Sequence, residues 1–162
     1  MIFEKATEKD LPRIVEIYNE SIPGQMATAD LKPVSVKERE PWFKQFNDHY
    51  PIWVIKDNQN IMGWVSIEAF YGRPAYHRTV EVSIYIANEA QHQGLGQRAL
   101  DYVFANLNKL GHNTIVAFIF SHNIPSQKLF KKNGFEVWGH LPDVADMDGK
   151  NRSLDILGRK FN

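Results

Sequence analysis

A glycine-rich segment beside an acidic strand carries the clearest chemical signal in the sequence. The segment 91–96 reads Gln-His-Gln-Gly-Leu-Gly and follows a β-branched run at 81–86. A glycine turn that leads directly into a helix presents free backbone N–H groups, which form a site for phosphate. Glu81 lies on the strand that leads into this turn. A candidate general base and a phosphate anchor are therefore predicted to belong to one rigid unit.

Alternation along this strand separates a polar face from an apolar face, because successive side chains point to opposite sides. The polar face carries side-chain oxygens, on Thr79, Glu81, Ser83 and Tyr85. The apolar face is aliphatic and consists of Val80, Val82, Ile84 and Ile86. We expect the apolar face to lie in the core and the polar face to line a cleft, with Glu81 as the base. The alternative is a solvated carboxylate on an exposed strand face.

Two other interpretations of the glycine turn need weighing. Gly94-Leu95-Gly96 followed by Ala99 satisfies the G-x-G-x-x-A pattern of dinucleotide-binding proteins. That pattern requires a tight strand-to-helix turn and an acidic residue about 20 residues later. Here seven residues separate Ile86 from Gly94, and the next apolar strand, 114–120, ends without a carboxylate. The other alternative is a turn that binds nothing and only reverses the chain.

The composition restricts the class of protein. A chain of 162 residues with 43% hydrophobic residues is large enough to bury a core, and we expect one domain over 1–162. Acidic and basic residues are equal at 19 each, so no net charge favours nucleic acid or an anionic membrane as a partner. The absence of cysteine excludes disulfides and a cysteine nucleophile, and fits the cytoplasm. The six histidines lack metal-binding spacing, so we expect no metal.

Periodicity and turn residues predict a mixed α/β domain. Helices are expected after Thr7 and over 35–47, 96–110 and 126–133, and 21–34 is expected to be a long loop. Strands are expected over 2–6, 52–56, 61–69, 78–87, 114–120, 135–140 and 153–160. Because the strand at 114–120 is wholly apolar, we expect both of its faces to be covered.

Two motifs in order resemble those of the GNAT superfamily of N-acetyltransferases. Gln91-x-x-Gly94-x-Gly96 is similar to the acetyl-CoA signature Q/R-x-x-G-x-G/A. The segment 123–135, Asn-Ile-Pro-Ser-Gln-Lys-Leu-Phe-Lys-Lys-Asn-Gly-Phe, is similar to the pattern N-x-x-S/A-x-x-L-Y-x-x-x-G-F. The resemblance covers essentially the whole chain. It implies a central mixed, mostly antiparallel sheet splayed between two strands and flanked by about four helices.

Within the superfamily, the chain resembles the phosphinothricin and methionine-sulfoximine acetyltransferases. Thr79-Val80-Glu81 before Ser83-Ile84-Tyr85-Ile86 is similar to their T-V-E-x-S-V-Y-V strand. Arg73-Pro74 and Tyr76-His77-Arg78 resemble the segment that precedes this strand. Asn19-Glu20-Ser21 and Ala27-Thr28-Ala29-Asp30 resemble their first substrate loop.

The resemblance implies a role for each matching position. Backbone groups around Ile84–Ile86 would hold the pantetheine arm of acetyl-CoA, and Glu81 would deprotonate the amine. The pyrophosphate would be wrapped by the turn, which comprises Gln91, His92, Gln93, Gly94, Leu95, Gly96 and Gln97. Asn123 would bond the pantetheine, with Ser126 near the cofactor. Asn123 is equally well placed to cap a helix.

Substrate contacts and the proton donor are less well determined. Arginine is the best bidentate partner for a carboxylate, so Arg73 and Arg78 are candidates to bind an amino acid. Tyr76 and Thr28 are candidates to line the same pocket. The chain has Phe130 where the family commonly carries a Tyr or His acid. A phenyl ring cannot donate a proton, so the general acid is unassigned.

The sequence thus predicts a cytoplasmic, acetyl-CoA-dependent N-acetyltransferase acting on the α-amino group of a small amino-acid-like molecule, such as phosphinothricin, methionine sulfoximine or methionine sulfone. We expect no nucleic-acid or membrane partner, and the family resemblance implies a homodimer. Two alternatives stay open. One is an N-acetyltransferase of a protein N-terminus or another amine on the same fold. The other is a non-catalytic acyl-CoA-binding sensor.

Overall fold

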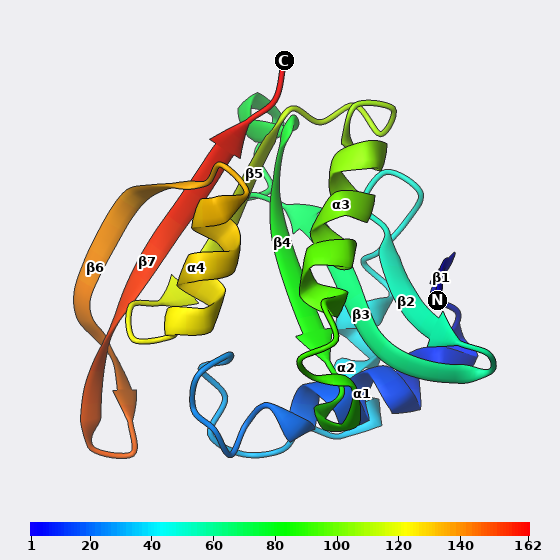
Figure 1. The fold of residues 1–162 in the computed structure, drawn as a ribbon, viewed down its shortest axis with the longest axis horizontal. Helices are drawn as coiled ribbons and strands as arrows, with labels where there is room; N and C mark the ends of the chain where they lie inside the picture. The colour runs from blue at the N-terminus through cyan, green and yellow to red at the C-terminus, as the bar shows by residue number, and fades with distance from the viewer.

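A single seven-stranded sheet organises the protein in the computed structural model, which describes residues 1–162 (Figure 1). The strands are β1 (Ile2–Lys5), β2 (Ile52–Asp57), β3 (Asn60–Ala69), β4 (Thr79–Ile86), β5 (Thr114–Phe120), β6 (Glu136–Met147) and β7 (Lys150–Lys160). The helices are α1 (Leu11–Glu20), α2 (Val36–Phe43), α3 (Leu95–Leu107) and α4 (Ile124–Lys132), with 3-10 turns η1 (Glu8–Asp10), η2 (Pro74–Tyr76) and η3 (Asn88–Ala90). The expected GNAT fold, a mixed sheet with four helices, is confirmed.

The sheet divides between β4 and β5. Its order is β1-β2-β3-β4-β5-β7-β6, and every neighbouring pair is antiparallel except β4 and β5. Those two parallel strands pair only from Thr79 to Glu81 on β4, opposite Thr114 to Val116 on β5. Beyond Glu81 the strands separate, as the ribbon shows (Figure 1). The remainder of β4, through Ile86, therefore has an open edge, and we call this opening the fork.

Two separate cores lie on the two faces of the sheet. On one face, α3 and α4 pack against residues that include Val80, Ile115 and Leu157, all fully buried. On the other, α1 covers Val54 and Trp64 of β2 and β3, and Trp42 of α2 packs at the edge of this cluster. The helices α3 and α4 therefore cover one face along both halves of the sheet. The helices α1 and α2 cover the other face only over β2, β3 and the end of β4. None of the helices is both long and apolar enough to cross a membrane.

Three expectations about elements are wrong in detail. α2 ends at Phe43 instead of Asn47, because the Asn47 side chain accepts the N–H groups of His49 and Tyr50 and turns the chain. β6 and β7 are longer than expected, because a register shift between Leu141 and Ala145 accommodates the irregular segment that contains Pro142.

The expectation that both faces of β5 are covered is wrong at Phe118 alone, since Thr114, Val116 and Phe120 on the same face are buried. Phe118 is 42% exposed because no helix covers the β5–β7–β6 half of its face. Trp138, 45% exposed, lies over Gly158 on the same face, where a Cβ on residue 158 would come within 2.0 Å of the indole. An uncovered apolar area therefore adjoins the fork.

The two faces of β5 predict different responses to truncation. Ile115→Ala should lower the free energy of unfolding by about 2–5 kcal/mol, because Ile115 is fully buried at the base of the fork. Phe118→Ala on the same strand should cost about 1 kcal/mol or less, because its side chain is partly exposed. Urea denaturation of both variants measures the difference. Equal losses would contradict the exposed position of Phe118.

Candidate active site

Glu81 is the last residue of β4 that pairs with β5, and its side chain lies on the same face of the sheet as that of Glu68. Its cross-strand partner on β3 is Glu68, so two carboxyl groups face the same side of neighbouring strands. Glu81 accepts no hydrogen bond and forms no ion pair within the protein. Burial, and then the charge of Glu68, raise the pKa of Glu81 from 4.5 to about 7. A carboxyl group with this pKa is suited to exchange protons near neutral pH.

Aromatic side chains from α1, α2, β3 and β4 gather on this face of the sheet. The Trp42 indole Nε1 donates to Glu68 Oε1 at 3.2 Å. Further along the two strands, Tyr85 stacks on Trp64 with ring centroids 4.8 Å apart, and contacts Tyr18 edge-on at 5.0 Å. The polar face expected on β4 therefore carries a ring cluster towards its open end, and Trp42 contacts the carboxyl pair through Glu68.

The glycine turn presents a row of unpaired backbone donors. His92 and Gly94 adopt left-handed conformations, with φ of 62° and 76°, and the turn leads into α3 at Leu95. The backbone N–H groups from His92 to Gln97 have no hydrogen-bond acceptor in the protein. The first backbone hydrogen bond of α3 is donated by Arg98 N–H to Gly94 O at 3.1 Å. Free N–H groups at a helix N-terminus form an anion site.

Side chains of the turn are used to hold it in place. Gln91 Nε2 donates to Ile86 O at 2.9 Å, which joins the turn to the open end of β4. Gln97 pairs through its amide with Asn133 at 2.8 Å, which joins α3 to the end of α4. Gln93 is exposed and Leu95 is buried.

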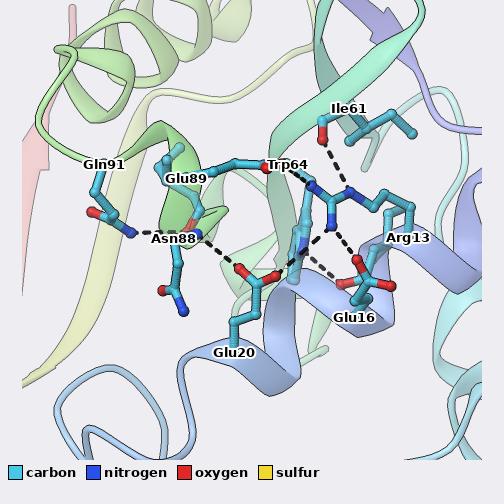
Figure 2. Close-up of polar contacts among 10 residues, drawn as sticks. Arg13, Glu16, Glu20, Ile61, Trp64, Asn88, Glu89 and Gln91 are labelled. Atoms are coloured by element: carbon cyan, nitrogen blue, oxygen red, sulfur yellow. Dashed lines mark hydrogen bonds and ion pairs between the residues drawn. The ribbon is translucent and has the colours of Figure 1, made fainter.

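Arg13 anchors the segment before the turn to α1 (Figure 2). Its guanidinium bonds Glu16, donates to Ile61 O at 3.1 Å and pairs with Glu89 at 2.8 Å. Glu20, at the end of α1, accepts the backbone N–H of Asn88 at 2.8 Å. Figure 2 shows these contacts joining α1 to η3, the turn that immediately precedes Gln91.

A segment of the α1–α2 loop crosses the fork, and we call residues 25–28 the strap. From β4, the Tyr85 hydroxyl donates to Ala27 O at 3.2 Å. From the end of β5, Asn123 Nδ2 donates to Met26 O at 3.0 Å, and Gln25 O lies 3.3 Å from His122 Nε2. Burial raises the pKa of Tyr85, so its hydroxyl stays protonated and can donate. The strap therefore joins the two separated strands.

Residues expected near the cofactor occupy different environments. Asn123 caps α4, because its Oδ1 accepts from Ser126 N at 3.3 Å, and its amide nitrogen is taken by the strap. Ile84 and Ile86 are half-buried at the open end of β4. Phe130 is only 6% exposed and packs edge-on against Phe135 at 4.9 Å, so it belongs to the core.

The expected substrate contacts fall into two groups. Arg73, Tyr76 and Arg78 are exposed on the connection between β3 and β4, which contains η2. Thr28 is 9% exposed at the end of the strap, with its hydroxyl 2.5 Å from that of Tyr18. Thr28 is thus the one expected contact that is buried beside the ring cluster.

Sequence analysis missed Glu68 and Trp42. Alternation along β3 could have placed Glu68 on the same face as Trp64, but its position opposite Glu81 depends on the register between β3 and β4, which the irregular connection through η2 does not reveal. No comparable signal exists for Trp42, because its contact with β3 depends on how α2 packs.

A free strand edge, an unpaired carboxyl group and a row of free backbone N–H groups adjoin the fork. The chain belongs to the acetyltransferase (GNAT) family, whose profile matches residues 11–135. It is similar to YwnH of Bacillus subtilis (strain 168), named as a candidate phosphinothricin acetyltransferase: 44% identity with both chains fully covered. It is also similar to the L-methionine sulfoximine/L-methionine sulfone acetyltransferase of Pseudomonas aeruginosa: 31% identity over 94% of this chain and 89% of that one.

The same fold occurs in a phosphinothricin acetyltransferase from Sinorhizobium meliloti in complex with acetyl-CoA. The TM-score is 0.91 at 28% identity, and the match covers 99% of this chain and 88% of that one. The protein is therefore an acetyl-CoA-dependent N-acetyltransferase of the phosphinothricin-type group.

The raised pKa of Glu81 predicts a pH-dependent stability effect. The folded protein binds the Glu81 proton more tightly than the unfolded chain, so stability falls as pH rises from about 4.5 to about 7. Glu81→Gln should therefore stabilise the protein at pH 8 by on the order of 1–3 kcal/mol and change little at pH 4. Denaturant unfolding at the two pH values measures this. A loss of stability at pH 8 would contradict the burial of an unpaired carboxylate.

Proposed function

We propose that the protein transfers an acetyl group from acetyl-CoA to the α-amino group of a small amino-acid-like substrate, with Glu81 as general base. Phosphinothricin, methionine sulfoximine and methionine sulfone are the substrates that the names of the relatives suggest. The observation that carries this proposal is the position of Glu81, an unpaired carboxyl group with a pKa of about 7 where the fork begins.

In the proposed reaction, the substrate arrives as an ammonium ion. Glu81 accepts one proton from it, directly or through water, and later returns that proton to solvent. The neutral amine attacks the thioester carbonyl carbon, so that a C–N bond forms and the C–S bond breaks. The thiolate leaves with the bonding electron pair, and the nitrogen loses a second proton to water, which gives the neutral amide.

The chain's own backbone supplies the groups that would hold acetyl-CoA. The N–H groups from His92 to Gln97 would bind the pyrophosphate, and the open edge at Ile84, Tyr85 and Ile86 would pair with the pantetheine arm. Gln91 and Gln97 would hold the turn in place through their side-chain hydrogen bonds. Gln93, which is exposed, would contact the cofactor from the solvent side. Asn123 and Ser126 would contact the arm at the start of α4.

No side chain needs to protonate the leaving thiolate in this scheme. Phe130 cannot do so, because a phenyl ring has no proton to donate and its side chain packs in the core. A thiol pKa near 8.5 makes unassisted departure feasible at neutral pH.

The remaining assignments concern substrate contacts, oligomeric state and location in the cell. Arg73, Tyr76 and Arg78 would contact the substrate from the exposed side, and Thr28 from the buried side. The exposed side chains Phe118 and Trp138, which lie on one face of the sheet, support a homodimer, because clustered exposed apolar groups mark association surfaces. A single domain in the cytoplasm, with no nucleic-acid or membrane partner, completes the proposal.

Thiol release from acetyl-CoA, followed with a disulfide reagent, tests the reaction and its substrate class. The chain has no cysteine, so the protein adds no background. Turnover is expected with methionine sulfoximine, methionine sulfone or phosphinothricin, and not with a short peptide or spermidine. Turnover of the peptide alone would replace the proposal with N-terminal acetylation. No turnover at all, with acetyl-CoA still raising the melting temperature, would favour a sensor.

Replacing the base should separate catalysis from cofactor binding. Glu81→Gln should lower kcat by about 10²–10⁴-fold, because the amine then has no proton acceptor. The Kd for acetyl-CoA should stay the same, because the cofactor-binding backbone is unchanged. Steady-state kinetics and calorimetry measure the two effects. Unchanged kcat would remove Glu81 as the base.

A further inference from the structure

The Trp42 indole lies between two opposite charges close to Glu81. Its Nε1 donates to Glu68 Oε1 at 3.2 Å. The guanidinium carbon of Arg39 lies 4.7 Å from the Trp42 ring centroid and 4.4 Å from that of Tyr18. One ring therefore contacts a carboxylate at its edge and a cation over its face. Both charges therefore contact the same indole.

The Arg39 guanidinium has aromatic neighbours but no acceptor. It makes no hydrogen bond and no ion pair within the protein, although its side chain is partly buried. Arg159 provides a comparison, because it also lies over two rings, Phe104 and Phe161, yet donates to Asn133 O at 2.7 Å. Stacking thus does not prevent an arginine from using its donors. The donors of Arg39 are available to a ligand.

Glu68 is also incompletely paired. The bond from Trp42 uses one of its oxygens, and no cation pairs with it. Glu81, its cross-strand partner, is likewise unpaired. Partly buried charges without partners are unfavourable, so a ligand carrying both complementary charges would stabilise this arrangement.

We propose that Arg39, Trp42 and Glu68 form a subsite for the zwitterionic head of an α-amino acid. Arg39 binds the α-carboxylate, and Glu68 holds the α-ammonium beside Glu81. The inference rests on the proposed function and deepens it, because it makes a free α-carboxylate the feature by which the substrate is recognised. An α-amino acid carries the two complementary charges on one α-carbon, and Arg39 and Glu68 contact one indole.

Arg39 is better placed than Arg73 or Arg78 to select a carboxylate. The latter two are exposed on the β3–β4 connection, where water and salt weaken an ion pair. Arg39 is fixed between two rings and partly removed from water, which strengthens a bidentate contact. A peptide N-terminus would place a neutral carbonyl at Arg39 and lose this contact.

The decisive comparison is between L-methionine sulfone and its carboxamide, which keeps the amine and lacks the carboxylate. Arg39→Gln should raise KM for the acid on the order of 10- to 100-fold and leave KM for the carboxamide unchanged. Arg159→Gln, which replaces the other arginine stacked on two rings, is the matched control and should leave the acid-to-carboxamide ratio unchanged. Arg73→Gln tests the competing position and should change that ratio far less than Arg39→Gln. Because both substrates are measured on one variant, the ratio is independent of the fraction folded.

Glu68→Gln provides the second arm, since both substrates carry an ammonium group. It should raise KM for the acid and the carboxamide alike. It should also move the acidic limb of the pH profile of kcat/KM to lower pH, because removing a like charge lowers the pKa of Glu81. The shift of this limb reports the charge of Glu68 beside Glu81, and the KM increase reports the ammonium contact.

Three outcomes overturn the inference. Equal KM increases for acid and carboxamide in Arg39→Gln would make Arg39 a packing residue. A selective effect in Arg73→Gln alone would move the carboxylate contact to η2. Unchanged KM values in Glu68→Gln would remove the ammonium contact. Failure of the unaltered enzyme to acetylate any amino acid would instead overturn the proposed function, and this inference with it.

Discussion

The end of the parallel pairing between β4 and β5 is the constraint on which the rest of the structure depends. A sheet normally satisfies both edges of each inner strand. Here β4 loses its second partner after Glu81, and its free edge continues to Ile86. The glycine turn follows that edge at once, and the strap crosses the opening from the other side. The free strand edge begins where this ladder is interrupted, with the Glu81 carboxyl group at its start and the free N–H groups of the turn beyond its end.

The chain stabilises this opening with contacts drawn from distant segments. Arg13 and Glu20 of α1 hold η3, while the strap joins Tyr85 to Asn123. Phe130 is buried in the α3–α4 core and contributes packing. The neighbouring carboxyl groups of Glu81 and Glu68 lie on the opposite face of the sheet.

Local pattern predicted the parts of the site that lie on one element. Alternation along β4 gave the correct faces, and the spacing from Gln91 to Gly96 located the turn before α3. The carboxyl pair was missed because it depends on the register of two strands, and the Trp42 contact because it depends on helix packing. Periodicity alone extended α2 too far, since Asn47 ends the segment through side-chain bonds to the backbone.

The fork also bears on the order in which the two substrates can bind. It is a gap between β4 and β5, with α3 on one face of the sheet and Glu81 on the other. A donor held at the start of α3 and an acceptor beside Glu81 would approach from different sides, so neither would obstruct the entry of the other. Direct transfer within a ternary complex then needs no acyl-enzyme stage, and double-reciprocal plots at several donor concentrations should intersect instead of running parallel.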